Sequence, residues 1–333
     1  MPNIITCSYL MKVYFGGMDR RFLSFNPQPI IWALMGLLYA GTPKLEADPI
    51  KVVATTSLVA DLVREVGGHR LEVQALMGPG VDPHLYKPSA GDIMRLSRAK
   101  IVFYHGLSLE GKMGDLFRRL EQQGRSIHAI TRSLSSEDLI HSQASPSHPD
   151  PHVWGDPRLW KHCVSEVSQT LAQMDPDGAA YYEQAANTYR QSLDEWFTWG
   201  RSLIEQIDAS RRVLITSHDA FNYFGNAFGL KVLGVQGIST SSEAPLADII
   251  HLVDFIRQRS IPAVFVESSV SPTLIRRISE DAGVKVGGEL FSDALGESGK
   301  MGTHAGKSYD LGTYKGWLGH NLSTIARALA DPK

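Results

Sequence analysis

From about residue 50 onward, short runs of aliphatic and β-branched residues alternate with longer stretches whose apolar positions recur every three or four residues. The short runs predict strands at 51–56, 71–76, 100–104, 126–130, 212–216, 230–235, 263–267 and 284–288. The longer stretches predict helices at 58–66, 89–98, 110–123, 157–173, 219–228, 245–259, 272–282 and 312–330. This alternation is typical of α/β proteins, in which helices connect the strands of a parallel sheet.

Two of these helices have clear start signals. Ser57 precedes the first apolar helical run and is expected to cap it, and Gly67 with Gly68 ends it. Asp156-Pro157 supplies a capping carboxylate followed by proline at the first helical position, where its missing N–H costs nothing.

A single long helical stretch separates the two halves. It starts at Asp175-Pro176 and continues to about Asp208, so ~32 residues at 1.5 Å each would extend roughly 48 Å. A flexible linker would be rich in Gly, Ser and Pro, whereas this stretch is rich in Tyr, Gln, Leu and Trp. We therefore expect two α/β lobes, 48–174 and 209–333, each with a central, mainly parallel sheet flanked by helices, joined by one long rigid helix at 175–208.

Residues 1–47 are predicted to form an export signal. Arg20 and Arg21 precede an apolar run at 29–40 of about a dozen residues, which is too short for a bilayer that needs ~20. Ala40 or Ala47 would be the cleavage point, and no Cys follows the run, so a lipid anchor is not expected. The alternative, a buried N-terminal helix, is disfavoured by the prolines at its start. We expect a periplasmic or otherwise extracytoplasmic protein.

Composition narrows the class of partner. The 333 residues are 43% hydrophobic and 20% charged with a net charge of −2, which is ordinary for globular proteins and gives no basic field for nucleic acid. Cys7 and Cys163 are the two cysteines of the chain. They are too few for a disulfide framework or a cysteine-rich zinc module, so a metal site would use nitrogen and oxygen ligands.

Ligands of doubly wound sheets bind beyond the carboxyl ends of the strands, so functional polar residues are expected in the loops that follow the strands. His84 follows the second predicted strand, His152 precedes the helix at residue 157, His218 directly follows a strand, and Asp293 follows the last strand. Three imidazoles and one carboxylate suit Zn²⁺, or Mn²⁺ with a bidentate carboxylate. Two of these residues belong to each lobe, so the expected site lies in the cleft between the lobes.

Several alternatives remain for the polar residues. Each histidine taken singly also fits a hydrogen-bonded loop residue, because the spacing forms no local motif. His105 is either a further ligand or a core residue, and Glu267 is either a partner of a ligand or a general base. His141 and His148 either recruit metal or lie in a solvated loop, and His304 has no assigned role.

Three segments, 82–92, 149–154 and 216–224, resemble the metal-binding solute-binding proteins of zinc/manganese ABC transporters (the ZnuA/TroA type). Segments 266–269 and 290–296 resemble them too, and the resemblance extends in order from about residue 50 to the end. The resemblance implies ligands at His84, His152, His218 and Asp293, and two α/β lobes joined by a long helix. It also implies one Zn²⁺ or Mn²⁺ per chain, an ABC permease as partner, a monomeric receptor and no enzymatic activity.

The chain departs from this family in two places. Residues 297–308 resemble an insertion, and the loop before the second ligand, 141–148, is short where many zinc-type members carry a long histidine-rich loop. One alternative function is a zinc-dependent hydrolase, which would need an open metal position for water. Four protein ligands would close that position, so this alternative depends on Asp293 not binding the metal. The other alternative is a surface adhesin with a structural metal.

Overall fold

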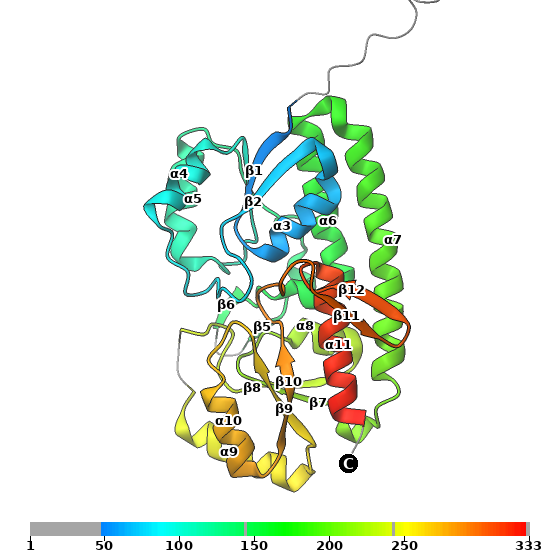
Figure 1. Cartoon of the computed structure of the whole chain (residues 1–333). Helices are drawn as coiled ribbons and strands as arrows, with labels where there is room; N and C mark the ends of the chain where they lie inside the picture. Colours follow the sequence, from blue (N-terminus) through cyan, green and yellow to red (C-terminus); the bar gives the residue numbers. More distant parts are fainter. Residues whose placement is uncertain (1–47, 143–144, 242–243, 331–333) are drawn as a thin grey trace, which may run out of the picture. The chain divides into compact units, whose positions relative to one another are not determined.

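The computed structural model describes residues 48–142, 145–241 and 244–330, and the predicted export signal lies outside them. The first lobe contains a four-stranded parallel sheet in the order β2-β1-β3-β4 (Figure 1). Its elements are β1 (Ile50–Ala54), α3 (Ser57–Gly67), β2 (Leu71–Ala75), α4 (Ala90–Arg98), β3 (Ile101–Tyr104), α5 (Gly114–Gln122), β4 (Ile127–Ala129) and α6 (Pro157–Met174). The predicted α/β alternation of this lobe is confirmed.

The second lobe also alternates strands and helices, but its parallel strands form two two-stranded sheets instead of one four-stranded sheet. Strands β7 and β8 pair in parallel, β9 and β10 pair in parallel, and β7 lies beside β9. The elements are β7 (Val213–Thr216), α8 (Asn222–Phe228), β8 (Lys231–Gly234), α9 (Leu246–Arg259), β9 (Ala263–Glu267), α10 (Thr273–Ala282), β10 (Lys285–Leu290) and α11 (Tyr314–Ala330). In both lobes the carboxyl ends of the strands carry loops toward the other lobe (Figure 1).

Two antiparallel hairpins were absent from the sequence expectations. One joins β5 (His141–Ser142) to β6 (Ser145–Pro149), and the other joins β11 (Met301–His304) to β12 (Lys307–Asp310). The second hairpin occupies the insertion-like segment. Its turn residues Ala305 and Gly306 have φ of 44° and 78°, the left-handed conformation that two-residue hairpin turns require. Both hairpins were missed because their strands are short and carry no alternating apolar pattern.

Helix α7 (Ala179–Ile204) joins the two lobes. The predicted stretch of 175–208 therefore contains a one-turn 3-10 helix (Pro176–Gly178) followed by the α-helix, which ends at Ile204. The helix packs against α3 and α6 of the first lobe and against α8 and α11 of the second. Its buried residues recur at helical spacing: Tyr182, Ala186, Tyr189, Leu193, Trp196, Gly200, Leu203 and Ile204. None of the helices in the described ranges combines the length and apolar character needed to cross a bilayer.

One predicted helix cap is confirmed and one is wrong. Asp156 caps α6 by accepting a hydrogen bond from the backbone N–H of Arg158 at 2.8 Å, with Pro157 in the first turn. The cap of α3 is Thr56 rather than Ser57, because the Thr56 hydroxyl accepts from the N–H of Val59 at 3.2 Å. Ser57 is instead the first helical residue, and its hydroxyl accepts a hydrogen bond from the N–H of Leu295 in the second lobe at 2.9 Å.

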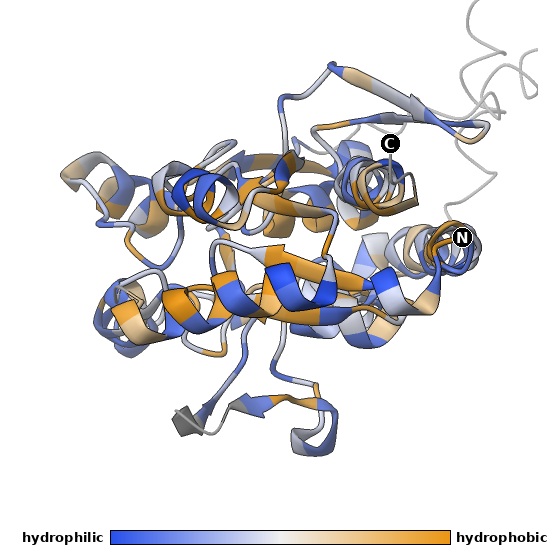
Figure 2. Ribbon diagram, turned by 90° about the horizontal axis from the view of Figure 1, so that it is seen from below, coloured by the Kyte–Doolittle hydropathy of each residue, from blue (hydrophilic) through white to orange (hydrophobic). Residues whose placement is uncertain are grey.

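A hydrophobic core extends without interruption from the first lobe into the second. At its centre the ring of Tyr314 on α11 stacks on Trp160 of α6, with centroids 5.3 Å apart, and on Trp317 at 5.9 Å. Figure 2 shows the hydrophobic strands between helices whose outward faces are hydrophilic. The two lobes are therefore joined by packed aromatic side chains as well as by α7.

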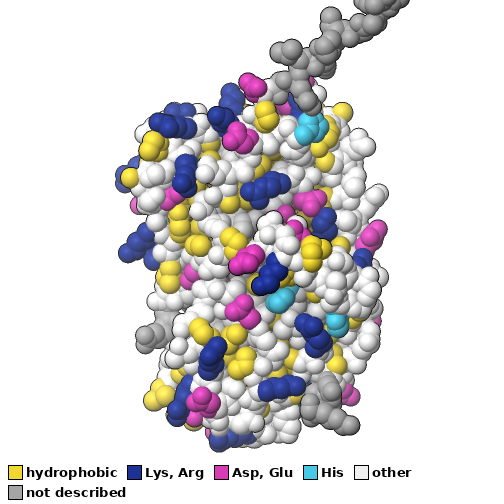
Figure 3. Space-filling model, viewed as in Figure 1, with side chains coloured by type: hydrophobic (Ala, Val, Ile, Leu, Met, Phe, Trp, Pro, Cys, Tyr) yellow, Lys and Arg dark blue, Asp and Glu magenta, His cyan; other side chains and the backbone are white. Residues whose placement is uncertain are grey.

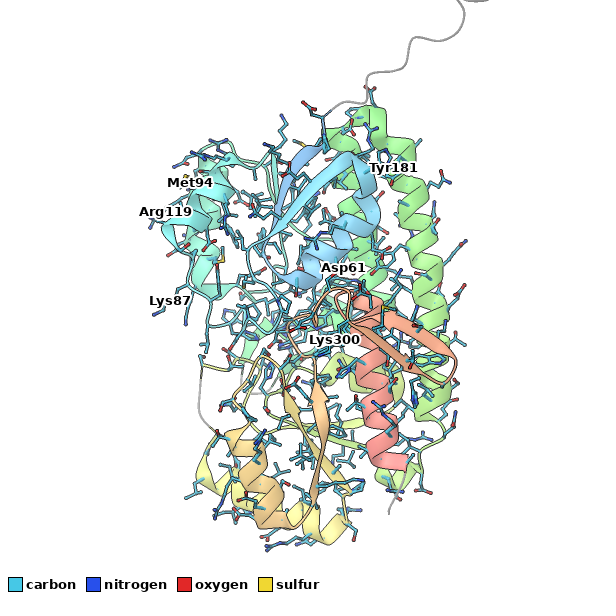
Figure 4. All side chains as sticks on the ribbon, viewed as in Figure 1. Asp61, Lys87, Met94, Arg119, Tyr181 and Lys300 are labelled. Carbon is cyan, nitrogen blue, oxygen red and sulfur yellow. The ribbon has the colours of Figure 1, made fainter. Side chains whose placement is uncertain are left out.

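Asp61 on α3 is a buried acid at this junction (Figure 4). Its carboxylate accepts a hydrogen bond at 2.9 Å from the N–H of Tyr314, the first residue of α11. One turn further along α3, Glu65 pairs with Lys315 at 3.1 Å. Burial raises the pKa of Asp61 to about 7, although the Tyr314 N–H opposes the shift.

This buried acid predicts a pH-dependent stability. Because the folded protein binds a proton at Asp61 more tightly than the unfolded chain does, the group's contribution to the free energy of unfolding falls as pH rises from about 4 to about 7. Asp61→Asn should remove this component, so wild type should lose stability relative to the variant between pH 5 and pH 7.5. Urea denaturation with a chelator present measures it. Parallel pH profiles for the two proteins would contradict the assignment.

A second stability prediction concerns Gly155, where the first lobe closely approaches the backbone of α8 in the second lobe. A Cβ at this position would lie 2.7 Å from the backbone nitrogen of Phe224 on α8, so the neighbour cannot yield by a side-chain rotation. Gly155→Ala should destabilise the protein by about 1–3 kcal/mol, as overpacking usually does. Gly111→Ala is the control, because nothing lies within 4 Å of its Cβ. Equal urea midpoints for the two variants would contradict the close approach.

Candidate metal centre

His84 lies in a turn between β2 and α4 that its own backbone helps to build. The Asp82 carboxylate accepts hydrogen bonds from the N–H of His84 at 2.8 Å and from that of Leu85 at 3.4 Å. This side-chain turn replaces a backbone turn, which is the usual use of Asp in loops. The imidazole of His84 is 9% exposed.

His152 is fully buried and is oriented by Asp150. One oxygen of Asp150 accepts from the backbone N–H of His152 at 2.9 Å and lies 2.6 Å from its Nδ1. The other oxygen accepts at 3.1 Å from the side-chain amide of Asn222 on α8. These contacts leave Nε2 of His152 as the nitrogen that faces the cleft. The next residue back, Pro151, is held through its carbonyl by Nε2 of His105 at 2.6 Å.

His218 directly follows β7 and is oriented by Glu267 at the end of β9. The backbone N–H of His218 donates to Oε1 of Glu267 at 2.9 Å, and Nδ1 lies 2.6 Å from Oε2. Both residues are buried. Of the two roles expected for Glu267, the geometry supports that of a partner that orients a ligand.

Asp293 is held in the loop after β10 by the helix behind it. The side-chain amide of Asn321 on α11 both accepts from the N–H of Phe291 at 2.9 Å and donates to its carbonyl at 2.7 Å. The Oδ2 atom of Asp293 accepts from the hydroxyl of Ser269 at 3.0 Å. Asp293 is 1% exposed, so its carboxylate is removed from water on all sides.

The four predicted residues converge on one point between the lobes. One ligand atom from each of His84, His152, His218 and Asp293 lies within 4.8 Å of all the others. Nε2 of His84 is 3.3 Å from Nε2 of His152, and the Asp293 oxygens are 3.4 Å from Nε2 of His152 and of His218. Ligands at 2.0–2.1 Å in tetrahedral geometry are separated by roughly 3.3–3.4 Å, so these spacings fit one ion.

The electrostatics of the group also fit a cation. Among the described residues, Nε2 of His218 and Oδ1 of Asp293 have no hydrogen-bond partner although both are buried, a costly arrangement unless something else binds them. Burial lowers the pKa of His84 to about 4. Burial also lowers the pKa of His152, but Asp150 more than reverses this and raises it to about 9. Glu267 and Asp293 likewise raise the pKa of His218 despite its burial.

The remaining histidines lie outside this group. His105 is a core residue that supports the loop of His152, and burial lowers its pKa to about 3. His148, on β6, lines a cavity of about 460 Å³ together with His84, whereas His141 begins β5 and His304 ends β11. On the face shown in Figure 3, side chains of both charge signs are interspersed, in agreement with the absence of a basic field in the composition.

Sequence reasoning assigned no role to Asp150, Ser269 or Asn321, which hold the candidate ligands in place. Asp150 and Ser269 lie inside segments that carried the family resemblance, so adjacency to a ligand motif was an available signal. Asn321 lies on a distant helix, and its contact with the Asp293 loop follows from tertiary packing alone.

Comparison with known proteins places the chain in a family. A family model described as the periplasmic component A of a zinc-uptake complex (ZnuA) matches residues 52–328. The manganese-binding lipoprotein MntA of Bacillus subtilis (strain 168) is 40% identical over 308 residues, covering 90% of this chain and 97% of the relative. The zinc-binding protein TroA of Treponema pallidum (strain Nichols) is 38% identical over 304 residues, covering 89% of this chain and 95% of the relative.

The solved structure of periplasmic zinc-binding protein TroA from Treponema pallidum superposes with a TM-score of 0.79 at 38% identity, covering 85% of this chain and all of the other. The predicted fold class, two α/β lobes joined by a long helix, is thereby confirmed, as is the family resemblance. The chain belongs to the ZnuA family of periplasmic zinc-uptake components.

Proposed function

We propose that this protein is an extracytoplasmic receptor that binds a divalent metal ion and delivers it to a membrane ABC permease. The observation that carries the proposal is the convergence of four buried ligand atoms, all within 4.8 Å of one another. One ion per chain would be bound by His84, His152, His218 and Asp293. Four protein ligands leave no open position for a reactive water, so the site favours binding over the hydrolase alternative.

Zn²⁺ is the cargo that we propose, with Mn²⁺ as the alternative. Three imidazole nitrogens and one carboxylate oxygen within 4.8 Å of one another suit Zn²⁺, and the Irving–Williams order gives it higher affinity than Mn²⁺ at such a site. Among the relatives, TroA is named for zinc and MntA for manganese, so both ions occur in this family.

The partner and the compartment are proposed from the same relatives. A Streptococcus pneumoniae relative that is 28% identical is named a manganese ABC transporter substrate-binding lipoprotein. By analogy, the partner of this chain would be an ABC permease. From the sequence, we also propose that the receptor acts as a monomer and that residues 1–47 direct its export. The proposed lobes are 48–174 and 209–333, on either side of the linking segment.

Removal of one ligand tests the site directly. Wild type should retain about one Zn²⁺ per chain after dialysis, whereas His218→Ala should bind it roughly 100-fold more weakly or not at all. His304→Ala is the matched control, because this histidine ends β11 outside the group, and it should retain the metal. Elemental analysis and chelator competition give stoichiometry and affinity. Unchanged binding by His218→Ala would refute the site, and metal-dependent hydrolysis by wild type that His84→Ala abolished would favour the hydrolase alternative.

Metal affinity should also depend on pH. Imidazoles must be neutral to bind an ion, and Asp150 raises the pKa of His152 to about 9 in the metal-free protein, so protons compete with the metal at neutral pH. The affinity for the metal should therefore fall as pH falls. If the metal displaces at least one proton, the affinity should be about 100-fold lower or more at pH 6 than at pH 8. Competition titrations with a chelator of known pH dependence measure this. Equal affinities at the two pH values would contradict it.

A further inference from the structure

Residues 235–241 follow β8 in the second lobe, and we name them the β8 loop. This loop contacts the first lobe beside the candidate metal centre. At its tip, the Thr240 hydroxyl donates a hydrogen bond of 2.6 Å to Oδ2 of Asp82. Asp82 is the same residue whose other oxygen forms the turn that carries His84. A side chain of the second lobe is thus fastened to the turn of a first-lobe ligand.

The base of the β8 loop lies against another ligand. The N–H of Gln236 donates to the carbonyl of Ser217 at 2.9 Å, directly before His218, and the N–H of Asp219 donates to the carbonyl of Gly237 at 3.3 Å, directly after it. Because these backbone hydrogen bonds extend the β7–β8 pairing, the base of the loop is fixed relative to His218. The Thr240 contact then fixes the position of His84 relative to His218.

His84 differs from the other two histidines in how it is oriented. Nδ1 of His152 and Nδ1 of His218 each lie 2.6 Å from a buried carboxylate oxygen. Among the residues that the structure describes, no carboxylate bonds Nδ1 of His84, so its ring is positioned mainly through the backbone turn at Asp82. A contact that holds this turn therefore holds the ligand.

His84 is also the ligand nearest to solvent. Its exposure is 9%, whereas His152 and His218 are fully buried and Asp293 is 1% exposed. His84 lines the cavity of about 460 Å³, and four residues of the β8 loop line the same cavity: Gly237, Ile238, Ser239 and Ser241. The β8 loop therefore borders the same cavity as the most exposed of the four candidate ligands.

We propose that the hydrogen bond between Thr240 and Asp82 is a latch that slows metal release. Both residues act as positioning residues, since neither contributes an atom to the candidate ligand group. While the latch is closed, the β8 loop holds the His84 turn beside this cavity, through which the ion would leave, and opening the latch lets His84 move away from the ion first. The inference rests on the proposed function, namely that the four residues hold a divalent ion.

Release kinetics test the latch. The purified protein is loaded with Zn²⁺ and mixed with excess chelator, and the release rate is measured for wild type, Thr240→Val, Thr240→Ser and His304→Ala. Thr240→Val keeps the shape of the side chain but removes the hydroxyl that donates to the Asp82 carboxylate. This variant should release Zn²⁺ about 10-fold faster or more. Thr240→Ser keeps the hydroxyl and should stay near the wild-type rate. His304→Ala, on β11 and outside the ligand group, should also stay near it.

Two further readouts separate a latch from a general structural role. The absorption spectrum of the Co²⁺-loaded protein should be the same for Thr240→Val and wild type, because the four ligands are unchanged. The urea midpoint of the metal-free protein should fall only slightly, because a single hydrogen bond is lost. Release from Thr240→Val at the wild-type rate, or release from Thr240→Ser as fast as from Thr240→Val, would overturn the latch. Failure of wild type to bind Zn²⁺ or Co²⁺ at all would instead overturn the proposed function.

Discussion

The carbonyl oxygen of Ser292 is the point on which the arrangement of the two lobes depends. It accepts hydrogen bonds from the indole N–H of Trp154 in the first lobe at 3.0 Å and from that of Trp317 on α11 at 3.1 Å. Trp154 lies two residues after His152, and Ser292 directly precedes Asp293. The contact that joins the lobes thus also sets the distance between two candidate ligands, one from each lobe.

A buried backbone carbonyl destabilises the fold unless it accepts a hydrogen bond, and here the donors to carbonyls of one lobe come from the other lobe. The Tyr314 hydroxyl donates to the carbonyl of Trp154 at 2.7 Å, and the hydroxyl of Tyr223 on α8 donates to that of Asp150 at 2.9 Å. Buried backbone carbonyls of the first lobe therefore obtain their hydrogen bonds from side chains of the second lobe. The positions of the candidate ligands therefore depend on these hydrogen bonds between the lobes and not on either lobe alone.

Much of the fold was accessible from the sequence, because apolar periodicity locates the strands. Three candidate ligands, His84, His218 and Asp293, could be named because they follow predicted strands, whereas His152 was named from its place before a helix and from the family resemblance. The hairpins at β5–β6 and β11–β12 were not, since their strands are too short to show a period. The partners that orient the ligands were accessible only in part. Glu267 ends a predicted strand and could be named, whereas the contacts of Asn321 and Thr240 join segments far apart in the chain.

The uninterrupted hydrophobic core has a consequence for how the protein folds. Because α3, α6, α7, α8 and α11 all contribute to one core, much of the apolar surface of each lobe is buried only when the other lobe is present, although each lobe also contains a smaller core cluster of its own. Two lobes with separate cores would unfold in separate steps, whereas a shared core makes the loss of one lobe expose the other. The shared core therefore couples the two lobes, so that damage to the part of either lobe that contributes to it lowers the stability of both.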